Sequence, residues 1–170
     1  IAGEISLTAG EPVWIEDVQV YPHWATKSVT IKGRLGNATG HPGQGAVVLA
    51  FSQLQGAKAQ PPARPATNSV SWSAEGGAFE VRMSLDCQPW DEFHPALYRL
   101  TTWIDGQHDQ RSVVFGLRDL STEGTQFTIN GRKIFIRGTL ECCIFPKTGH
   151  PPTEVEAWRR IIRVAKAHGL

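Results

Sequence analysis

The residues best able to do chemistry lie close together near the end of the sequence. Leu140 is followed by Glu141, Cys142 and Cys143, and His150 comes shortly after them. A zinc site needs spaced thiolates such as C-x2-C, which two adjacent cysteines do not provide. A nucleophilic thiol also needs a base that is held in place by a third group. The sequence therefore predicts no metal site, no catalytic cysteine and no cofactor.

Composition and charge exclude several other classes of function. The 170-residue chain has a formal net charge of +1, which gives no electrostatic basis for binding nucleic acid or an anionic membrane. No apolar run approaches the roughly 18 residues of a membrane span. The three cysteines are an odd number with two adjacent members, so they do not form a disulfide framework. The length predicts one full domain and part of a second.

A series of short β-strands must position any functional side chain. The clearest strand is residues 79–85, in which odd-numbered apolar residues alternate with polar ones and should face a core. Asp105-Gly106 predicts a two-residue hairpin turn between the last two strands. The other expected strands are residues 13–21, 29–35, 46–51, 70–74, 96–104 and 107–115, with a long loop over residues 54–69. These strands predict an antiparallel, immunoglobulin-like β-sandwich.

A β-hairpin is predicted next. Two β-rich runs, residues 127–129 and 134–136, flank Asn130-Gly131. This dipeptide is typical of a two-residue turn because the turn needs positive φ at both positions. The second run stops at Arg137-Gly138. The sequence therefore predicts a mainly β protein with a C-terminal hairpin.

The sequence pattern predicts a helix over residues 153–168, the only convincing helix in the sequence. Thr153 and Glu156 have the spacing of a capping box, which would satisfy free N–H groups of the first turn. Gly169 is well placed to end the helix. One face is apolar along its length and consists of Val155, Trp158, Ile161, Ile162 and Ala165.

Three short motifs follow one another over about 50 residues. They are W-x-x-x-x-P-x-L-Y with Trp90, Pro95, Leu97 and Tyr98; F-G-x-R with Phe115, Gly116 and Arg118; and F-x-x-N-G…R-G with Asn130, Gly131, Arg137 and Gly138. In this order and spacing the sequence resembles glycoside hydrolase family 2, the family of β-galactosidases, β-glucuronidases and β-mannosidases. We interpret the motif residues as structural: Trp90 and Tyr98 should bond to backbone groups, and Arg118 should pair at a domain junction.

The resemblance implies a division into four segments. Residues 1–10 would be the last strand of an upstream jelly-roll, sugar-binding domain. Residues 11–118 would be the immunoglobulin-like sandwich, and residues 119–126 a linker. Residues 127–170 would be the hairpin, first strand and first helix of a truncated TIM barrel.

The resemblance also implies an activity for a longer parent protein. Family 2 enzymes are retaining glycosidases with two carboxylates about 5–5.5 Å apart on barrel strands. In the family these residues come from later barrel strands, beyond Leu170. We therefore expect a non-catalytic fragment of an exo-glycosidase that hydrolyses terminal β-glycosides, with the sandwich buttressing the barrel. Arg137 and Glu141 are the candidates for the substrate pocket, but Glu141 does not align with the family's N-x-H-E-like run.

Other expectations stay open at this point. The alternative to an enzyme fragment is a stand-alone carbohydrate-binding or protein-interaction sandwich, whose tryptophans would stack on sugars. An unpaired barrel strand and an apolar helix face favour self-association through residues 125–170. The sequence begins without an initiator methionine or a signal segment, so we expect an excised segment. The resemblance favours a periplasmic or secreted parent enzyme, with carbohydrate as its substrate.

Overall fold

The computed structural model describes residues 5, 7, 9–54, 64–140, 142 and 145–170. The chain divides into two compact units, of which one contains Ile1–Ser121 and Thr128–Arg132 and the other Thr122–Phe127 and Lys133–Leu170. The strand expected within residues 1–10 lies mainly outside the described residues. Among the residues described, no helix has the length and apolar character needed to cross a membrane.

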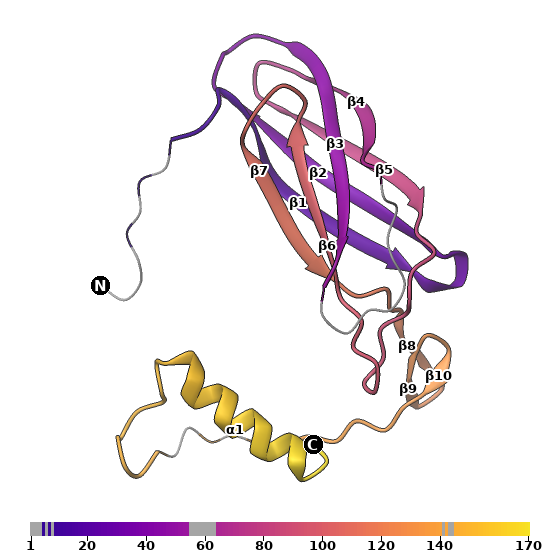
Figure 1. Cartoon of the computed structure of the whole chain (residues 1–170), viewed down its shortest axis with the longest axis vertical. Helices are drawn as coiled ribbons and strands as arrows, with labels where there is room; N and C mark the ends of the chain where they lie inside the picture. Colours follow the sequence, from indigo (N-terminus) through magenta and orange to yellow (C-terminus); the bar gives the residue numbers. More distant parts are fainter. Residues whose placement is uncertain (1–4, 6, 8, 55–63, 141, 143–144) are drawn as a thin grey trace. The chain divides into compact units, whose positions relative to one another are not determined.

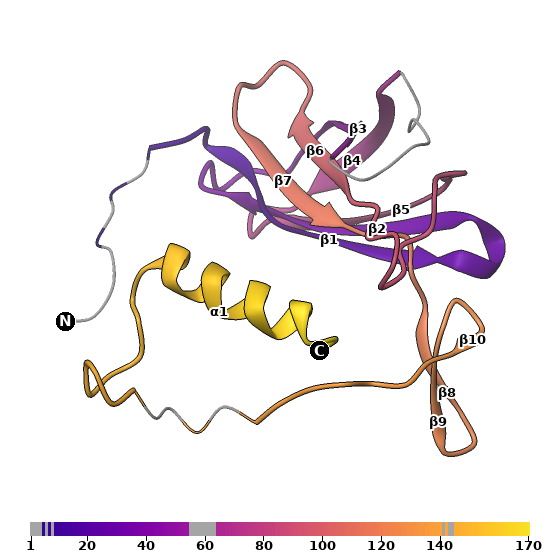
Figure 2. The same ribbon diagram turned by 60° about the horizontal axis from the view of Figure 1, so that its bottom comes forward.

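The first unit is a sandwich of two antiparallel sheets, stacked face to face in Figures 1 and 2. One sheet has the order β1-β2-β5, with β1 (Val13–His23), β2 (Ser28–Asn37) and β5 (Gly77–Ser84). The other has the order β4-β3-β6-β7, with β3 (Gly43–Gln53), β4 (Ala66–Trp72), β6 (Tyr98–Ile104) and β7 (Gln110–Phe115). The predicted mainly β, antiparallel sandwich is confirmed.

Apolar side chains from both sheets form one core between them. Ile31 of β2 and Leu49 and Leu100 of the facing sheet are completely buried. Burying one such side chain contributes roughly 1.5–3 kcal/mol to stability. On β5, the expected inward face is buried at Phe79 and, just after the strand, at Leu85, whereas Val81 and Met83 are half-buried at the rim of the core. The alternation predicted for β5 is therefore confirmed. Because β5 lies at the edge of its sheet, however, Val81 and Met83 near its middle are only partly buried.

Two boundaries of the sandwich differ from the prediction. The loop expected over residues 54–69 is wrong at its end, because residues 66–69 pair with β3 and belong to β4. The two-residue hairpin connection expected at Asp105-Gly106 is also wrong, although a turn is present there. Asp105 and Gly106 (φ 81°) do form the centre of a β-turn, closed by a hydrogen bond from Gln107 N to Ile104 O (3.0 Å), but the last pair of β6 and β7 is Trp103 with Gln110, so this turn lies within a longer hairpin loop. As a result, β7 begins at Gln110 rather than at residue 107.

A small sheet with the order β10-β9-β8 follows the sandwich. It consists of β8 (Leu120–Glu123), β9 (Gln126–Ile129) and β10 (Arg132–Lys133), so β8 lies within the segment expected to be a linker. Asn130 and Gly131 have φ of 51° and 75°, which confirms the predicted turn. Because the turn is tight, the strand that pairs with β9 begins directly after it, as β10. The strand expected at residues 134–136 is absent, although Ile134 N still donates to Phe127 O (2.9 Å).

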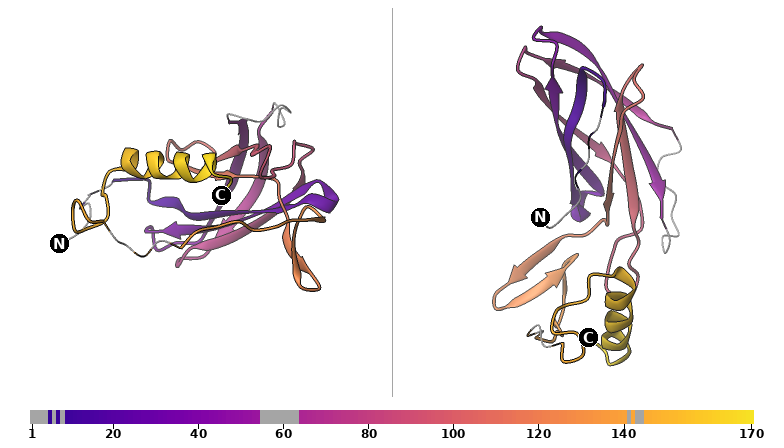
Figure 3. Two further views of the ribbon diagram at one scale, coloured as in Figure 1. Left: turned by 90° about the horizontal axis from the view of Figure 1, so that it is seen from below. Right: turned by 90° about the vertical axis from the view of Figure 1, so that its left-hand side faces the viewer.

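The helix α1 (Val155–Ala167) is confirmed, but its predicted cap is wrong. Its N-cap is Glu154, which makes no capping bond, and Glu156 pairs with Arg159 instead of bonding back to Thr153. Its C-terminal end is as expected, with Gly169 at a φ of 81°. Leu170 N donates to Ala165 O (3.1 Å) and Gly169 N to Lys166 O (3.0 Å), the two bonds of a Schellman motif. Leu170, at the end marked C in Figure 3, is itself part of this motif.

The apolar face of α1 is only partly covered. Trp158 packs edge-on against Phe145, with ring centres 6.0 Å apart, and donates its indole N–H to Pro152 O (2.8 Å). By contrast, Val155 and Ile162 keep 64% and 52% of their surface exposed. An exposed apolar stripe of this kind is unusual for a helix that has found its packing partner.

Candidate functional site

Residues from all three sequence motifs meet around Trp90 in the first unit. Trp90 N donates to Leu117 O (3.0 Å). Gly116 lies so close that a Cβ on it would be 2.8 Å from Trp90 Cβ. The guanidinium carbon of Arg118 lies 4.7 Å from the centre of the Trp90 ring, which is a cation–π distance. The first two motifs, 25 or so residues apart in sequence, therefore form one packed group.

Asn130 of the third motif completes this group. Its side-chain Nδ2 donates to Trp90 O (3.0 Å), and its Oδ1 accepts from Asp119 N (2.8 Å). Its own backbone N–H donates to Asp119 O (2.9 Å). Asn130 therefore combines the positive φ of a hairpin turn with hydrogen bonds to two distant segments. We call Trp90, Gly116, Leu117, Arg118 and Asn130 the Trp90 cluster.

The loop between Trp90 and Pro95 is fixed by its own carboxylates. Asp91 Oδ1 accepts from the backbone N–H groups of Phe93 (2.8 Å) and His94 (2.7 Å). Burial alone would raise the pKa of Asp91, but these N–H groups outweigh it, and the pKa lies below its usual range. Both oxygens of Glu92 accept from Arg132 Nη2, at 2.7 and 2.6 Å. This hydrogen bond lowers the pKa of Glu92.

Tyr98 anchors the other end of the same loop. Its side chain is completely buried, and its hydroxyl accepts from Gln88 N (2.9 Å) and donates to Gln88 O (3.3 Å). Burial raises the pKa of Tyr98 to about 12, so the hydroxyl stays protonated. The backbone partner expected for this tyrosine is therefore present. Burial also raises the pKa of the neighbouring Cys87, which disfavours the reactive thiolate.

The residues expected near a substrate pocket are not part of this cluster. Arg137 is exposed on the segment after β10, in the second unit. Glu141 lies outside the described residues, as does Cys143. Gly138 is in open space, since a Cβ on it would meet nothing within 4 Å. Across the described residues, no group of three or more histidine, cysteine or acidic side chains could hold a metal ion.

The tryptophans are used for packing rather than presented to solvent. Each of the six is half-buried. A Cβ on Gly36 would lie 2.3 Å from the Trp14 ring, and one on Gly43 would lie 2.8 Å from the Trp72 ring, so both rings rest directly on glycine backbone. The surface of Trp90 is covered by Arg118. This use of the rings speaks against a row of sugar-stacking platforms on the sandwich.

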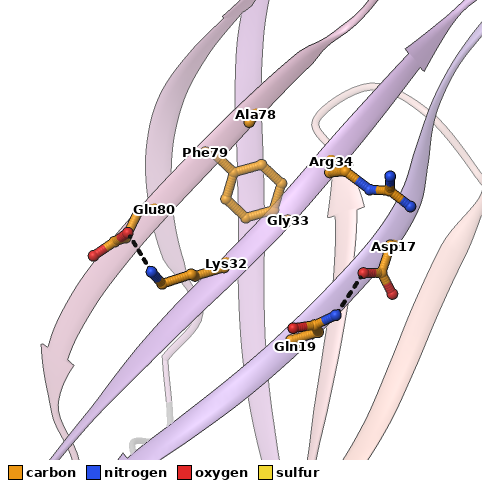
Figure 4. A pocket seen from close by; sticks show the side chains of 8 residues that line it. All are labelled: Asp17, Gln19, Lys32, Gly33, Arg34, Ala78, Phe79 and Glu80. Carbon is orange, nitrogen blue, oxygen red and sulfur yellow. Dashed lines mark hydrogen bonds and ion pairs between the residues drawn. The ribbon is translucent and has the colours of Figure 1, made fainter.

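The outer face of the β1-β2-β5 sheet carries a shallow hollow of about 700 Å³. Figure 4 shows that most of its polar side chains already pair with one another, Lys32 with Glu80 (3.1 Å) and Gln19 with Asp17 (3.0 Å). Exposed pairs of this kind contribute little to stability, and they also leave no free catalytic carboxylate. We therefore interpret this face as a solvated sheet surface.

Some residues of the Trp90 region were missed in the sequence. Asp119, Glu92 and Arg132 were not singled out, although their contacts hold the loop and the turn together. Opposite charge at positions 92 and 132 was the available signal, but nothing in the sequence places these two positions side by side. Pairing them requires the fold.

By its geometry the first unit is an antiparallel β-sandwich, in which residues of three sequence motifs form the Trp90 cluster. The sequence model of the family described as glycosyl hydrolases family 2 matches residues 13–118, which is more than half of the chain. The chain therefore belongs to glycosyl hydrolase family 2. No curated protein sequence matches it.

Solved structures of longer proteins share this fold. A family 2 glycosyl hydrolase from Bacteroides cellulosilyticus is 19% identical, with a TM-score of 0.59 over 76% of this chain and 19% of its own length. The Bacteroides uniformis β-glucuronidase 2 is 16% identical, with a TM-score of 0.63 over 92% of this chain and 19% of its own. A β-galacturonidase from Eisenbergiella tayi is 18% identical, with a TM-score of 0.56 over 72% and 21%. The chain thus spans about a fifth of the length of these relatives.

Proposed function

We propose that this chain is a non-catalytic part of a longer glycoside hydrolase. In this proposal the sandwich supports the catalytic part, and the Trp90 cluster fixes the point at which the chain leaves the sandwich. The observation that carries the proposal is the hydrogen bond from Asn130 Nδ2 to Trp90 O (3.0 Å), because it ties the hairpin turn to the sandwich. Membership of family 2 supports the wider activity.

The acid–base properties of the cluster support a non-catalytic role. A glycosidase needs a general acid whose pKa is raised, together with a second carboxylate about 5–5.5 Å away in a retaining enzyme. Asp91 and Glu92 have pKa values below the usual range, since N–H groups and Arg132 stabilise their ionised forms. Neither carboxyl is suited to donate a proton to a leaving group at neutral pH.

We further propose that the complete enzyme is a retaining exo-glycosidase acting on terminal β-glycosides. The similar solved structures include a β-glucuronidase and a β-galacturonidase, so uronides are the first substrates to test. The carbohydrate would bind to the complete enzyme rather than to the sandwich alone. A stand-alone binding module is less well supported, because the tryptophan rings are occupied by packing.

The test compares residues 1–170 with the complete gene product on a panel of 4-nitrophenyl β-glycosides that includes glucuronide, galacturonide, galactoside and mannoside. We expect turnover by the complete protein and none by residues 1–170. Measured turnover by residues 1–170 that survives repurification would contradict the proposal if Glu141→Gln or Glu92→Gln abolishes it. Absence of turnover by the complete protein on every glycoside would contradict the proposed activity.

A further inference from the structure

Arg118 is a cation held in a fixed position without a carboxylate partner in the described part of the chain. Its guanidinium lies over the Trp90 ring at 4.7 Å, and its side chain is exposed. Arg132 and Arg34, by contrast, pair with Glu92 and Glu16. The nearby carboxylates of Asp91 and Glu92 are already engaged by other donors. The hydrogen-bonding edge of Arg118 is therefore available to an incoming group.

A hollow of about 340 Å³ lies beside this guanidinium. Most of the residues that line it have apolar side chains, among them Val20 and Pro22 of β1, Leu97 just before β6 and Val114 of β7, and Arg118 lines it as well. Val114 is half exposed, whereas the other apolar side chains of the hollow are better covered. An apolar wall with one cation at its side fits a side chain that has an aliphatic stem and a carboxylate end.

We infer that Arg118 and this hollow receive a glutamate or aspartate side chain from another domain of the complete glycoside hydrolase. The inference rests on the proposed function, since it requires a longer protein. Charge complementarity identifies the occupant, because an arginine fork binds a carboxylate through two parallel hydrogen bonds. Stacking on Trp90 already restricts the guanidinium, so less conformational freedom is lost when the carboxylate arrives. A tethered domain supplies its carboxylate at an effective concentration in the millimolar range, so modest affinity suffices.

The first experiment uses residues 1–170 and follows the Arg118 side-chain N–H and the Trp90 indole N–H by NMR. The probe is N-acetylglutamate N-methylamide, and its neutral match is N-acetylglutamine N-methylamide. We expect saturable shifts with the glutamate probe alone. Arg118→Gln should abolish them, whereas Arg132→Gln, which removes a cation already paired with Glu92, should preserve them.

Four outcomes of this titration would overturn the inference. They are equal shifts with both probes, shifts that persist in Arg118→Gln, no shift at probe concentrations into the millimolar range, and a larger saturable shift with methyl β-D-glucuronide, which would identify a sugar acid as the occupant. None of these outcomes depends on hydrolytic activity. Failure of this inference and failure of the proposed activity are therefore distinguishable.

The second experiment asks whether the complete protein fills the site. Residues 1–170 and the complete protein are labelled with phenylglyoxal, and modification of Arg118 is measured by mass spectrometry relative to Arg82, an exposed residue of β5. We expect Arg118 to react about tenfold more slowly in the complete protein, as an engaged guanidinium is protected from the reagent. Equal relative rates in the two proteins would overturn the inference.

Discussion

The side-chain amide of Asn130 donates to the carbonyl oxygen of Trp90 at 3.0 Å, although 40 residues separate them in sequence. The same amide accepts from Asp119 N through its oxygen (2.8 Å). One side chain thus connects the loop before β6, the segment after β7 and the turn between β9 and β10. Together with the pair of Arg132 and Glu92, these hydrogen bonds hold the β9–β10 turn against the loop before β6.

We predict that Asn130→Asp lowers the free energy of unfolding of the sandwich by about 1–2 kcal/mol. Aspartate also tolerates positive φ and keeps the oxygen that accepts from Asp119 N, but it has no N–H for Trp90 O. Urea denaturation followed by tryptophan fluorescence measures the change. Asn68→Asp on β4 is the matched control, and equal losses in the two variants would contradict a specific role for the Asn130 amide.

Gly116→Ala should destabilise the sandwich by about 1–3 kcal/mol, because the new methyl group would overlap Trp90 and force it to move. The nearest contact of the added Cβ is 2.8 Å, to Trp90 Cβ. Gly138→Ala is the control, since that position has open space around it. Thermal unfolding should separate the two variants, and equal melting temperatures would argue against close packing at Gly116.

The ion pair of Glu92 and Arg132 predicts a defined pH dependence. Because Arg132 lowers the pKa of Glu92 from its ordinary value of 4.5, the pair stabilises the fold above pH 4.5, and this stabilisation is lost as the pH falls below that value. Glu92→Gln and Arg132→Gln should each flatten the acid limb of the stability profile, and the double variant should resemble either single one. A profile unchanged in Arg132→Gln would contradict the assigned cause.

We propose self-association through residues 125–170, driven by the apolar face of α1. Ile162 is 52% exposed near the middle of this face, so Ile162→Glu should shift the chain toward monomer in light scattering over a range of concentrations. Trp158→Ala should act in the same direction but would also remove the contact with Phe145. Arg163→Gln on the polar face is the control. A wild-type chain that stays monomeric at high concentration would rule the proposal out.

Features set by local sequence were predicted well. The alternation of residues 79–85 and the Asn130-Gly131 turn follow from side-chain periodicity and from a backbone conformation that few residues adopt. The Gly169 helix end has the same kind of local cause. The sandwich could be predicted because enough of its strands carry such signals.

Features set by distant pairing were missed. β8 has four exposed residues and no apolar alternation, so only its partner β9 makes it a strand. The start of β4 is likewise polar and depends on β3. Asp105-Gly106 has the composition of a tight turn and forms one, yet β6 and β7 stop pairing at Trp103 and Gln110, which leaves a longer loop around it. The Trp90 cluster belongs to this group, since each motif was recognised but their meeting point was not.

The position of Asn130 also has a consequence for the order of folding. We predict that its contact with Trp90 forms after β6 and β7 have paired, because the contact joins residues 40 positions apart in sequence. Contacts between residues distant in sequence that form after the main barrier affect the unfolding rate more than the folding rate. Substitutions at Asn130 should therefore shorten the lifetime of the folded sandwich while leaving the speed of its formation nearly unchanged.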